Sequence, residues 1–164
     1  MSESTIWSRT QSLLVFYVFS TYEDFQSFRI SLDKVLDESN VKRLKVVVLI
    51  KDLKQNVLKH SLFSYITEKD IHFFTLELKK RAKNEFGQQL EVVRHSAFDV
   101  LLCFGRPTTK VMKWLMKIEV KEKIGVNVEG LDLFDLNLNL NLNSSSESIQ
   151  NSVLFVRDTL QKIK

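Results

Sequence analysis

One short segment in the second half of the chain combines residues that can bind an anion. Gly105 to Lys110 reads Gly-Arg-Pro-Thr-Thr-Lys and lies between a predicted strand and a predicted helix. Free backbone amides at the start of a helix favour negative charge. The guanidinium of Arg106 can make paired hydrogen bonds to a phosphate or carboxylate, Thr108 or Thr109 can donate a hydroxyl, and Lys110 adds positive charge. We therefore predict a small anionic ligand here.

The same segment also has a purely structural interpretation. Thr108 is a favourable N-cap residue, and Pro107 fixes the turn that precedes the helix. The segment lacks the spaced glycines of a Walker or dinucleotide-binding loop. Both interpretations, an anion site and a helix cap, stay open on the sequence.

The other reactive side chains form no catalytic or metal-binding pattern. His60, His72 and His95 are 12 and 23 residues apart, and none belongs to an i, i+4 pair or lies near a Cys-x-x-Cys. Cys103 is the one cysteine and sits in an apolar run, so we expect a buried, unreactive thiol rather than a nucleophile paired with His95. We predict no catalytic residue, no metal and no cofactor.

Two aspartates flank predicted strands. Asp99 stands at the start of its strand, whereas ligand sites of open α/β sheets lie at the carboxyl ends, so Asp99 is expected to shape the strand entry. Asp52 follows the carboxyl end of its strand and is the sequence's nominee for an acid or base if the chain is an enzyme. A lone carboxylate in that place more commonly caps a helix.

The elements that position these residues follow from the apolar patterns. Near-continuous apolar runs at 12–19, 44–50 and 98–104 are typical of strands covered on both faces, as in a parallel sheet. Residues 123–128 and 133–142 are predicted as two more strands, separated by a Glu-Gly turn.

Three helices are expected around these strands. Ser20 and Glu23 have capping-box spacing before an apolar stripe of Phe25, Phe28, Leu32, Val35 and Leu36. A second helix follows the predicted anion loop, with Val111, Leu115 and Ile118 on one face. The last begins near Ser146, after Ser144 and Glu147 at capping-box spacing, and continues the stripe to Ile163. Between 51 and 97 the pattern favours only a strand at 71–74 and short helices near 53–58 and 90–93.

A strand, a helix and a second strand make a βαβ unit, whose crossover is almost always right-handed. At 164 residues the chain has the usual length of one domain. We therefore predict a single α/β domain over 1–164. Its expected architecture is a three-layer, Rossmann-like or flavodoxin-like open sheet, mainly parallel, with helices on both faces.

Four Leu-Asn pairs run from Leu136 to Asn143. Side chains alternate between the two faces of a strand, so this segment has one apolar and one polar face. It is predicted to lie at the edge of the sheet, where pairing with a second copy would permit a homodimer.

Charge and hydropathy limit the classes of binding partner and the cellular locations that we expect. Lys and Arg number 24 against 20 Asp and Glu, interleaved along the chain. The densest basic runs are Lys42, Arg43 and Lys45, then Lys79, Lys80, Arg81 and Lys83. We interpret them as solvated edges rather than an RNA-binding surface, for which exposed aromatics or a motif would be expected. The seven apolar residues at 13–19 are too few to span a bilayer, and a cytoplasmic protein is expected.

The order of these patterns resembles a family of small uncharacterised bacterial proteins known as a domain of unknown function. The resemblance rests on 14–19 with Tyr22, Phe25 and Phe28, on 46–50, on 67–74, on 98–102, on Lys123-Ile124-Gly125 and on Phe134-Asp135-Leu136. The family has no assigned activity, so this resemblance identifies no functional residue in the chain.

A fainter similarity covers 98–130 and concerns the acceptor-side half of heptosyltransferase-like glycosyltransferases. It implies one of two Rossmann-like halves that close on a nucleotide sugar, and 164 residues provide one such half. The leading hypothesis is a non-catalytic cytosolic domain that binds a protein partner or a small anionic ligand. The alternatives are an enzyme of nucleotide-sugar or phosphate-ester chemistry and, last, RNA binding.

Overall fold

The computed structural model describes residues 4–50, 70–77, 97–107, 109–128, 134–138 and 146–164. Its elements, in chain order, are β1 (Ser12–Val18), α1 (Tyr22–Asp37), β2 (Arg43–Ile50), β3 (Asp70–Glu77), β4 (Phe98–Phe104), α3 (Thr109–Leu115), β5 (Val120–Val126), β6 (Leu136–Leu138) and α4 (Ser146–Leu160).

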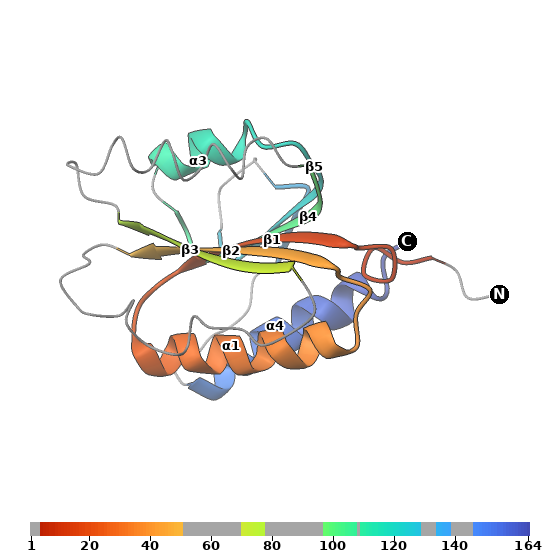
Figure 1. Ribbon diagram of the computed structural model, residues 1–164, viewed down its shortest axis with the longest axis horizontal. Helices are drawn as coiled ribbons and strands as arrows, with labels where there is room; N and C mark the ends of the chain where they lie inside the picture. The colour runs from red at the N-terminus through yellow and green to blue at the C-terminus, as the bar shows by residue number, and fades with distance from the viewer. Residues whose placement is uncertain (1–3, 51–69, 78–96, 108, 129–133, 139–145) are drawn as a thin grey trace.

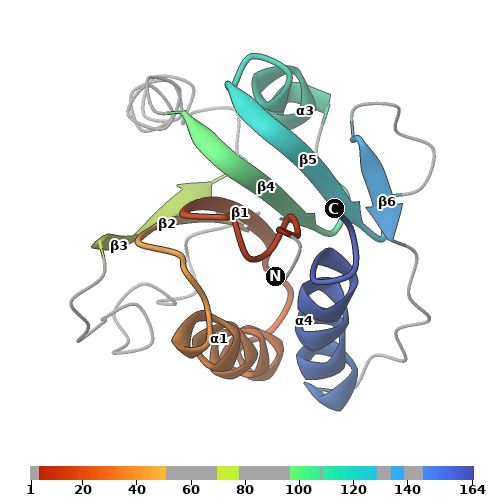
Figure 2. The same ribbon diagram turned by 90° about the vertical axis from the view of Figure 1, so that its right-hand side faces the viewer.

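The strands in the described ranges form one six-stranded sheet in the order β3-β2-β1-β4-β5-β6. Each of the five strand pairs is parallel. Helices α1 and α4 cover one face, and α3 lies on the other (Figures 1 and 2). The predicted three-layer α/β architecture is confirmed, and the strand order is the Rossmann order rather than that of flavodoxin.

Strand β1 shows why a continuous apolar run becomes a central strand. Its side chains alternate between the faces: Leu13, Val15 and Tyr17 join the core beneath α1 and α4. Leu14 and Phe16 join the separate core beneath α3. All five are nearly inaccessible, because neighbouring strands and both helical layers enclose β1.

Helix α1 buries the predicted apolar stripe, since Phe25, Phe28, Leu32, Val35 and Leu36 are all in the core. The predicted capping box was wrong by one residue. Thr21 is the N-cap, and its side chain accepts a hydrogen bond from the Asp24 amide at 3.2 Å. The Ser20 hydroxyl instead donates to the Asp24 carboxylate at 3.0 Å.

The remaining elements match their predictions to different degrees. Strand β4 has the predicted bounds, and the strand expected at 71–74 extends over 70–77. Strand β5 begins earlier than expected, and β6 covers three residues at the edge of the sheet, where the Leu-Asn segment was predicted to lie. Helix α4 begins at Ser146 as predicted. Asp52, His60, His95, Ser144 and the helices expected near 53–58 and 90–93 fall outside the described residues.

The first basic run is not a solvated edge, contrary to our expectation. Lys45 is buried within β2. Arg43 lies over the Phe98 ring, 4.9 Å from its centroid, and donates a hydrogen bond to the Ala97 carbonyl. Only Lys42 of this run is exposed. The second run, 79–83, lies outside the described residues.

None of the helices in the described ranges is long and apolar enough to cross a membrane.

Candidate functional site

The strand order reverses direction at β1, which pairs with β2 on one side and with β4 on the other. In open parallel sheets this switch point opens a crevice at the carboxyl ends of the strands, where ligands bind. A pocket of about 270 Å³ lies there. We call it the carboxyl-edge pocket; its lining is Tyr17, Val18, Ser20, Phe28, Phe104, Gly105, Val126, Asn127 and Ser152.

Three aromatic rings form one wall of this pocket. Tyr17 stacks on Phe28 with ring centroids 4.3 Å apart, and Phe28 meets Phe104 edge to face at 5.2 Å. Such ring pairs add stabilisation beyond the area they bury. Because strand and helix both contribute rings, the wall is held by the packing of α1 on the sheet.

The polar groups of the pocket follow the ends of the strands. Ser20 comes after β1 and Asn127 after β5, while Ser152 is on α4. Asn127 has a positive φ of 58°, a conformation that asparagine tolerates better than most residues. Its amide donates to the Leu138 carbonyl at 2.9 Å, which fixes the turn after β5.

Tyr17 is the ionisable side chain among the described residues of this lining. Burial raises the pKa of its phenol, the charge of Asp24 raises it further, and a hydrogen bond with Ser20 lowers it, leaving the pKa well above the ordinary value. At neutral pH the phenol is therefore protonated, and it can donate a hydrogen bond.

Gly105 closes the pocket between β1 and β4. Its φ is +93°, where a side chain is strained, and an added Cβ would lie 3.1 Å from the Cβ of Val18. Its amide donates to the Val126 carbonyl at 3.1 Å. The glycine therefore links the ends of β4 and β5 and leaves little room for a side chain beside Val18 of β1.

The structure brings one member of the predicted anion loop into the pocket lining, namely Gly105. Arg106 is the next residue and is exposed. Thr109 is exposed as the first residue of α3. Thr108 and the side chain of Lys110 are outside the described part of the chain. The anion site at Gly105, Arg106, Thr108, Thr109 and Lys110 stays a prediction.

Sequence reasoning missed most of the pocket. Ser20 and Asn127 each follow a strand directly, and parallel strands end at one edge, so both could have been nominated with Gly105. Tyr17 and Phe28 looked like ordinary core residues. Nothing in the sequence signalled Ser152, which reaches the pocket because α4 packs beside α1.

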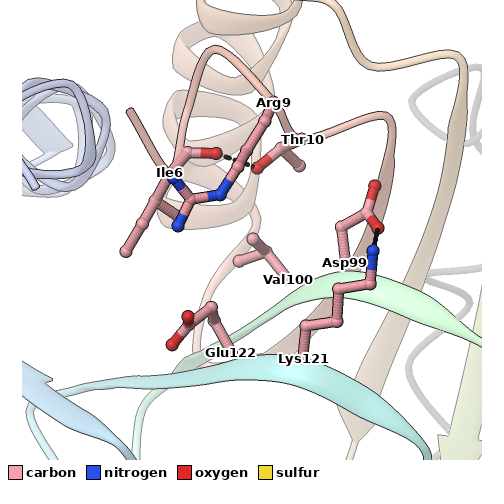
Figure 3. A pocket seen from close by; sticks show the side chains of 7 residues that line it. All are labelled: Ile6, Arg9, Thr10, Asp99, Val100, Lys121 and Glu122. Atoms are coloured by element: carbon pink, nitrogen blue, oxygen red, sulfur yellow. Dashed lines mark hydrogen bonds and ion pairs between the residues drawn. The ribbon is translucent and has the colours of Figure 1, made fainter. Parts of the chain in front are cut away.

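A second pocket, of about 300 Å³, lies at the opposite edge of the sheet, around the starts of β4 and β5 (Figure 3). We call it the amino-edge pocket; its lining is Ile6, Arg9, Thr10, Asp99, Val100, Lys121 and Glu122. Its charged residues distinguish it from the carboxyl-edge pocket.

Asp99 shapes the entry to the strands, as predicted. Its carboxylate accepts hydrogen bonds from the amides of Gln11 at 2.8 Å and Ser12 at 3.1 Å. In return the Asp99 amide donates to the Ser12 hydroxyl at 2.9 Å. Lys121 places its ammonium 3.3 Å from the same carboxylate. Burial alone would raise the pKa of Asp99, but the two amides and Lys121 together hold it below its ordinary value.

The start of β6 repeats this arrangement. Phe134 is buried, as Phe98 is. The Asp135 carboxylate that follows it accepts a hydrogen bond from the Lys123 amide at 2.8 Å, just as the Asp99 carboxylate accepts backbone amides. The two Phe-Asp pairs, which carry part of the sequence resemblances, thus have structural roles.

Cys103 is fully buried beneath α3, as predicted, and burial raises the pKa of its thiol to about 12. No cluster of three or more potential metal ligands occurs among the residues that the structure describes.

Comparison with solved structures places the fold beside glycosyltransferases. The chain aligns with the Escherichia coli heptosyltransferase WaaC, solved with ADP, at a TM-score of 0.57 and 8% identity, over 94% of this chain and 48% of that one. It also aligns with a family 9 glycosyl transferase from Veillonella parvula at a TM-score of 0.60 and 12% identity, over 99% of this chain and 44% of that one. The chain therefore spans just under half the length of each.

At these identities the likeness shows a shared Rossmann-like fold and no more. It agrees with the fainter of the two sequence resemblances. No family model and no curated sequence matches the chain, so the resemblance to small bacterial proteins of unknown function stays a prediction.

Proposed function

We propose that this chain is a non-catalytic cytosolic domain whose carboxyl-edge pocket binds a small ligand that carries an anionic group. The observation that carries the proposal is the position of this pocket, at the point in the sheet where β1 separates β2 from β4. Open α/β sheets bind their ligands at this place.

The lining suits a flat or apolar group with a few directional contacts. Stacked and edge-on rings of Tyr17, Phe28 and Phe104 provide the apolar surface. The Ser20, Asn127 and Ser152 side chains lie around it and can orient a ligand. This combination of an apolar wall and a few polar groups is typical of small-molecule sites.

Arg106 is the proposed contact for the anionic group. It follows Gly105 directly, is exposed, and makes no hydrogen bond or ion pair with another residue that the structure describes. Its guanidinium is therefore available to bind a phosphate or carboxylate with two hydrogen bonds. Thr108, Thr109 and Lys110 continue the proposed site along the chain.

Binding rather than turnover is proposed because of the chemistry that the pocket presents. The raised pKa of Tyr17 makes it a hydrogen-bond donor and a poor base at neutral pH. Cys103 is buried on the α3 side of the sheet, whereas Tyr17, Phe28 and Phe104 belong to the core under α1 and α4.

A thermal-shift screen with nucleotides, sugar phosphates and nucleotide sugars tests this proposal. A ligand present at ~100 times its Kd stabilises the folded state by roughly 2.7 kcal/mol, which raises the unfolding temperature measurably. Arg106→Ala should abolish the shift for the anionic ligand, whereas Lys34→Ala, which removes an exposed cation from α1, should retain it. The proposal fails if no anionic compound shifts the protein, or if Arg106→Ala leaves the shift intact.

A second candidate function is one half of a two-half glycosyltransferase. It is favoured by the alignment of nearly the whole chain with just under half of two such enzymes. The chain would then bind a nucleotide sugar and require a second Rossmann-like half from another protein. Asp52 remains the sequence's nominee for its acid or base.

Product analysis in the same screen separates the two candidates. The binding domain should return a nucleotide sugar unchanged, whereas a transferase half supplied with its second half should release the free nucleotide. Nucleotide sugars that give neither a shift nor release would rule out the second candidate.

Homodimerisation through the edge segment 136–143 is a further part of the proposal. Strand β6 forms the last position of the sheet, so a second copy could extend the sheet there. Light scattering should then show a dimer at high concentration, and a clean monomer would contradict this part alone.

A further inference from the structure

The amino-edge pocket contains two charged side chains, Arg9 and Glu122, that form no ion pair with another described residue. Lys121 and Asp99 lie in the pocket but bind one another at 3.3 Å, and Asp99 also holds two backbone amides. Arg9 and Glu122 differ from this pair. Arg9 makes one long hydrogen bond, from its guanidinium to the Ser4 carbonyl at 3.4 Å, and the Glu122 carboxylate makes no hydrogen bond or ion pair within the described part of the chain.

These two charges come from different elements and face the same space. Arg9 lies in the turn before β1, and Glu122 lies on β5 (Figure 3). They are more than an ion-pair distance apart, since no salt bridge joins them. Among the described residues, the cation of Arg9 and the anion of Glu122 thus have no ion-pair partner across the pocket.

The surface between these charges is apolar. Val100 and Ile6 are buried, with 1% and 6% of their surfaces exposed, and they line the pocket between Arg9 and Glu122. The Thr10 hydroxyl is occupied, since it donates to the Ile6 carbonyl at 2.6 Å. The pocket therefore offers one positive contact, one negative contact and an apolar surface.

From this arrangement we propose that the amino-edge pocket binds a small zwitterion of the free amino acid class. Its carboxylate binds Arg9, whose guanidinium matches the two oxygens of a carboxylate. Its ammonium binds Glu122, and its side chain lies on Val100 and Ile6. The volume, about 300 Å³, is at the small end of ligand sites, which span roughly 300–1,000 Å³.

Charge disfavours the ligand class proposed for the other edge. A nucleotide or sugar phosphate brought to Arg9 would meet the carboxylate of Glu122, which repels additional negative charge, while the cation of Lys121 is already paired with Asp99. The two pockets are therefore expected to select different ligands, and each can be tested without the other.

Calorimetric titration with L-alanine, L-serine, L-leucine and L-lysine, each alone, tests the proposal. At least one should bind, and its N-acetyl and methyl ester derivatives should not, because each lacks one charge. Arg9→Met and Glu122→Gln should each weaken binding by about tenfold or more, which is ~1.4 kcal/mol per tenfold change in Kd. Arg9→Lys, which keeps the charge but loses the planar fork, should weaken it less than Arg9→Met.

Matched variants outside the pocket control for charge and for folding. Lys42→Met and Glu119→Gln remove one exposed cation and one exposed anion and should leave amino acid binding unchanged. The unfolding temperature without ligand should be the same for all variants. Three results would overturn the proposal: no binding by any of the four amino acids, equal binding by a singly charged derivative, or a double-mutant cycle showing that Arg9 and Glu122 stabilise one another without ligand.

Discussion

The two edges of the sheet use polar residues in opposite ways. At the amino edge, charged side chains bind the backbone: Asp99 holds the amides of Gln11 and Ser12, and Arg43 binds the Ala97 carbonyl. At the carboxyl edge, the pocket is lined by rings and by neutral polar groups such as Ser20 and Asn127. The amino edge thus has more charged side chains than the carboxyl edge, and most of them already stabilise the fold.

This difference shows how to weigh candidate residues in an open parallel sheet. A carboxylate at a strand start meets the unpaired amides of the neighbouring strand, and it is stabilised by accepting them. A residue after a strand end meets a crevice instead. Asp99 therefore supports the fold, whereas the weaker-looking Gly105 and Asn127 belong to a pocket.

The largest expected effect comes from Gly105→Ala at the carboxyl edge. The φ of +93° strains a residue with a Cβ, and that Cβ would crowd Val18. Strain of this kind costs about 1–3 kcal/mol, and we expect a loss of that size in the free energy of unfolding, measured in urea. It should be accompanied by weaker binding in the carboxyl-edge pocket.

The two causes can be separated with one more substitution. Val18→Ala removes the contact with the Val18 Cγ2 atom at 3.2 Å but keeps the Cβ contact at 3.1 Å and the backbone strain, so the double variant should recover only a small part of the loss. A Gly105→Ala protein as stable as the original would show that this turn tolerates a side chain, and that the glycine is not what holds the carboxyl edge.

The layers of the fold could be predicted because they depend on local patterns. The runs that form β1, β2 and β4 are apolar on both faces, and the apolar stripe of α1 has helical spacing. Each local pattern therefore indicates both the type of element and which of its faces is buried. The role of Asp99 was predictable for the same reason, since its place at a strand start does not depend on the order of the strands.

The rest of the pocket, beyond the residues that directly follow strands, could not be predicted because it depends on contacts between distant parts of the chain. Tyr17 and Gly105 meet only because β1 pairs with β4 across the sheet, and Ser152 arrives from the last helix. The helix cap was mispredicted for a different, local reason. Ser20 with Glu23 and Thr21 with Asp24 have the same spacing, so the spacing does not distinguish them; in the structure Thr21 accepts the Asp24 amide, and Ser20 binds the Asp24 side chain.

A smaller effect is expected from Asp99→Asn at the amino edge, and it should depend on pH. The folded-state pKa of Asp99 is lowered, so its charge stabilises the fold fully above its unfolded pKa of about 3.9. That stabilisation is lost as the pH falls through the folded-state value. Hydrogen bonds to a charged group contribute about 1.5–3 kcal/mol, and Asn keeps one acceptor oxygen, so a loss of roughly 1–2 kcal/mol is expected near pH 7.

Urea unfolding at a series of pH values measures this dependence. The difference between the original protein and Asp99→Asn should be largest at neutral pH and should shrink in acid. A difference that stayed constant as the pH fell from 7 through the unfolded pKa of about 3.9 and further into acid would contradict a charged role, because protonation removes the charge that the two amides and Lys121 stabilise.

The smallest expected effect is a lack of reactivity in the folded protein. It concerns the thiol of Cys103, one residue before the carboxyl end of β4, and not the free energy of unfolding. With a pKa of about 12 and no exposed surface, the folded thiol should not react with a disulfide reagent at pH 8. Reaction should appear only as the chain unfolds, with the same urea midpoint as the loss of structure. Rapid labelling of the folded protein would mean that the carboxyl edge opens on the α3 side as well. The carboxyl edge would then be accessible on both faces of the sheet, and not only on the face covered by α1 and α4.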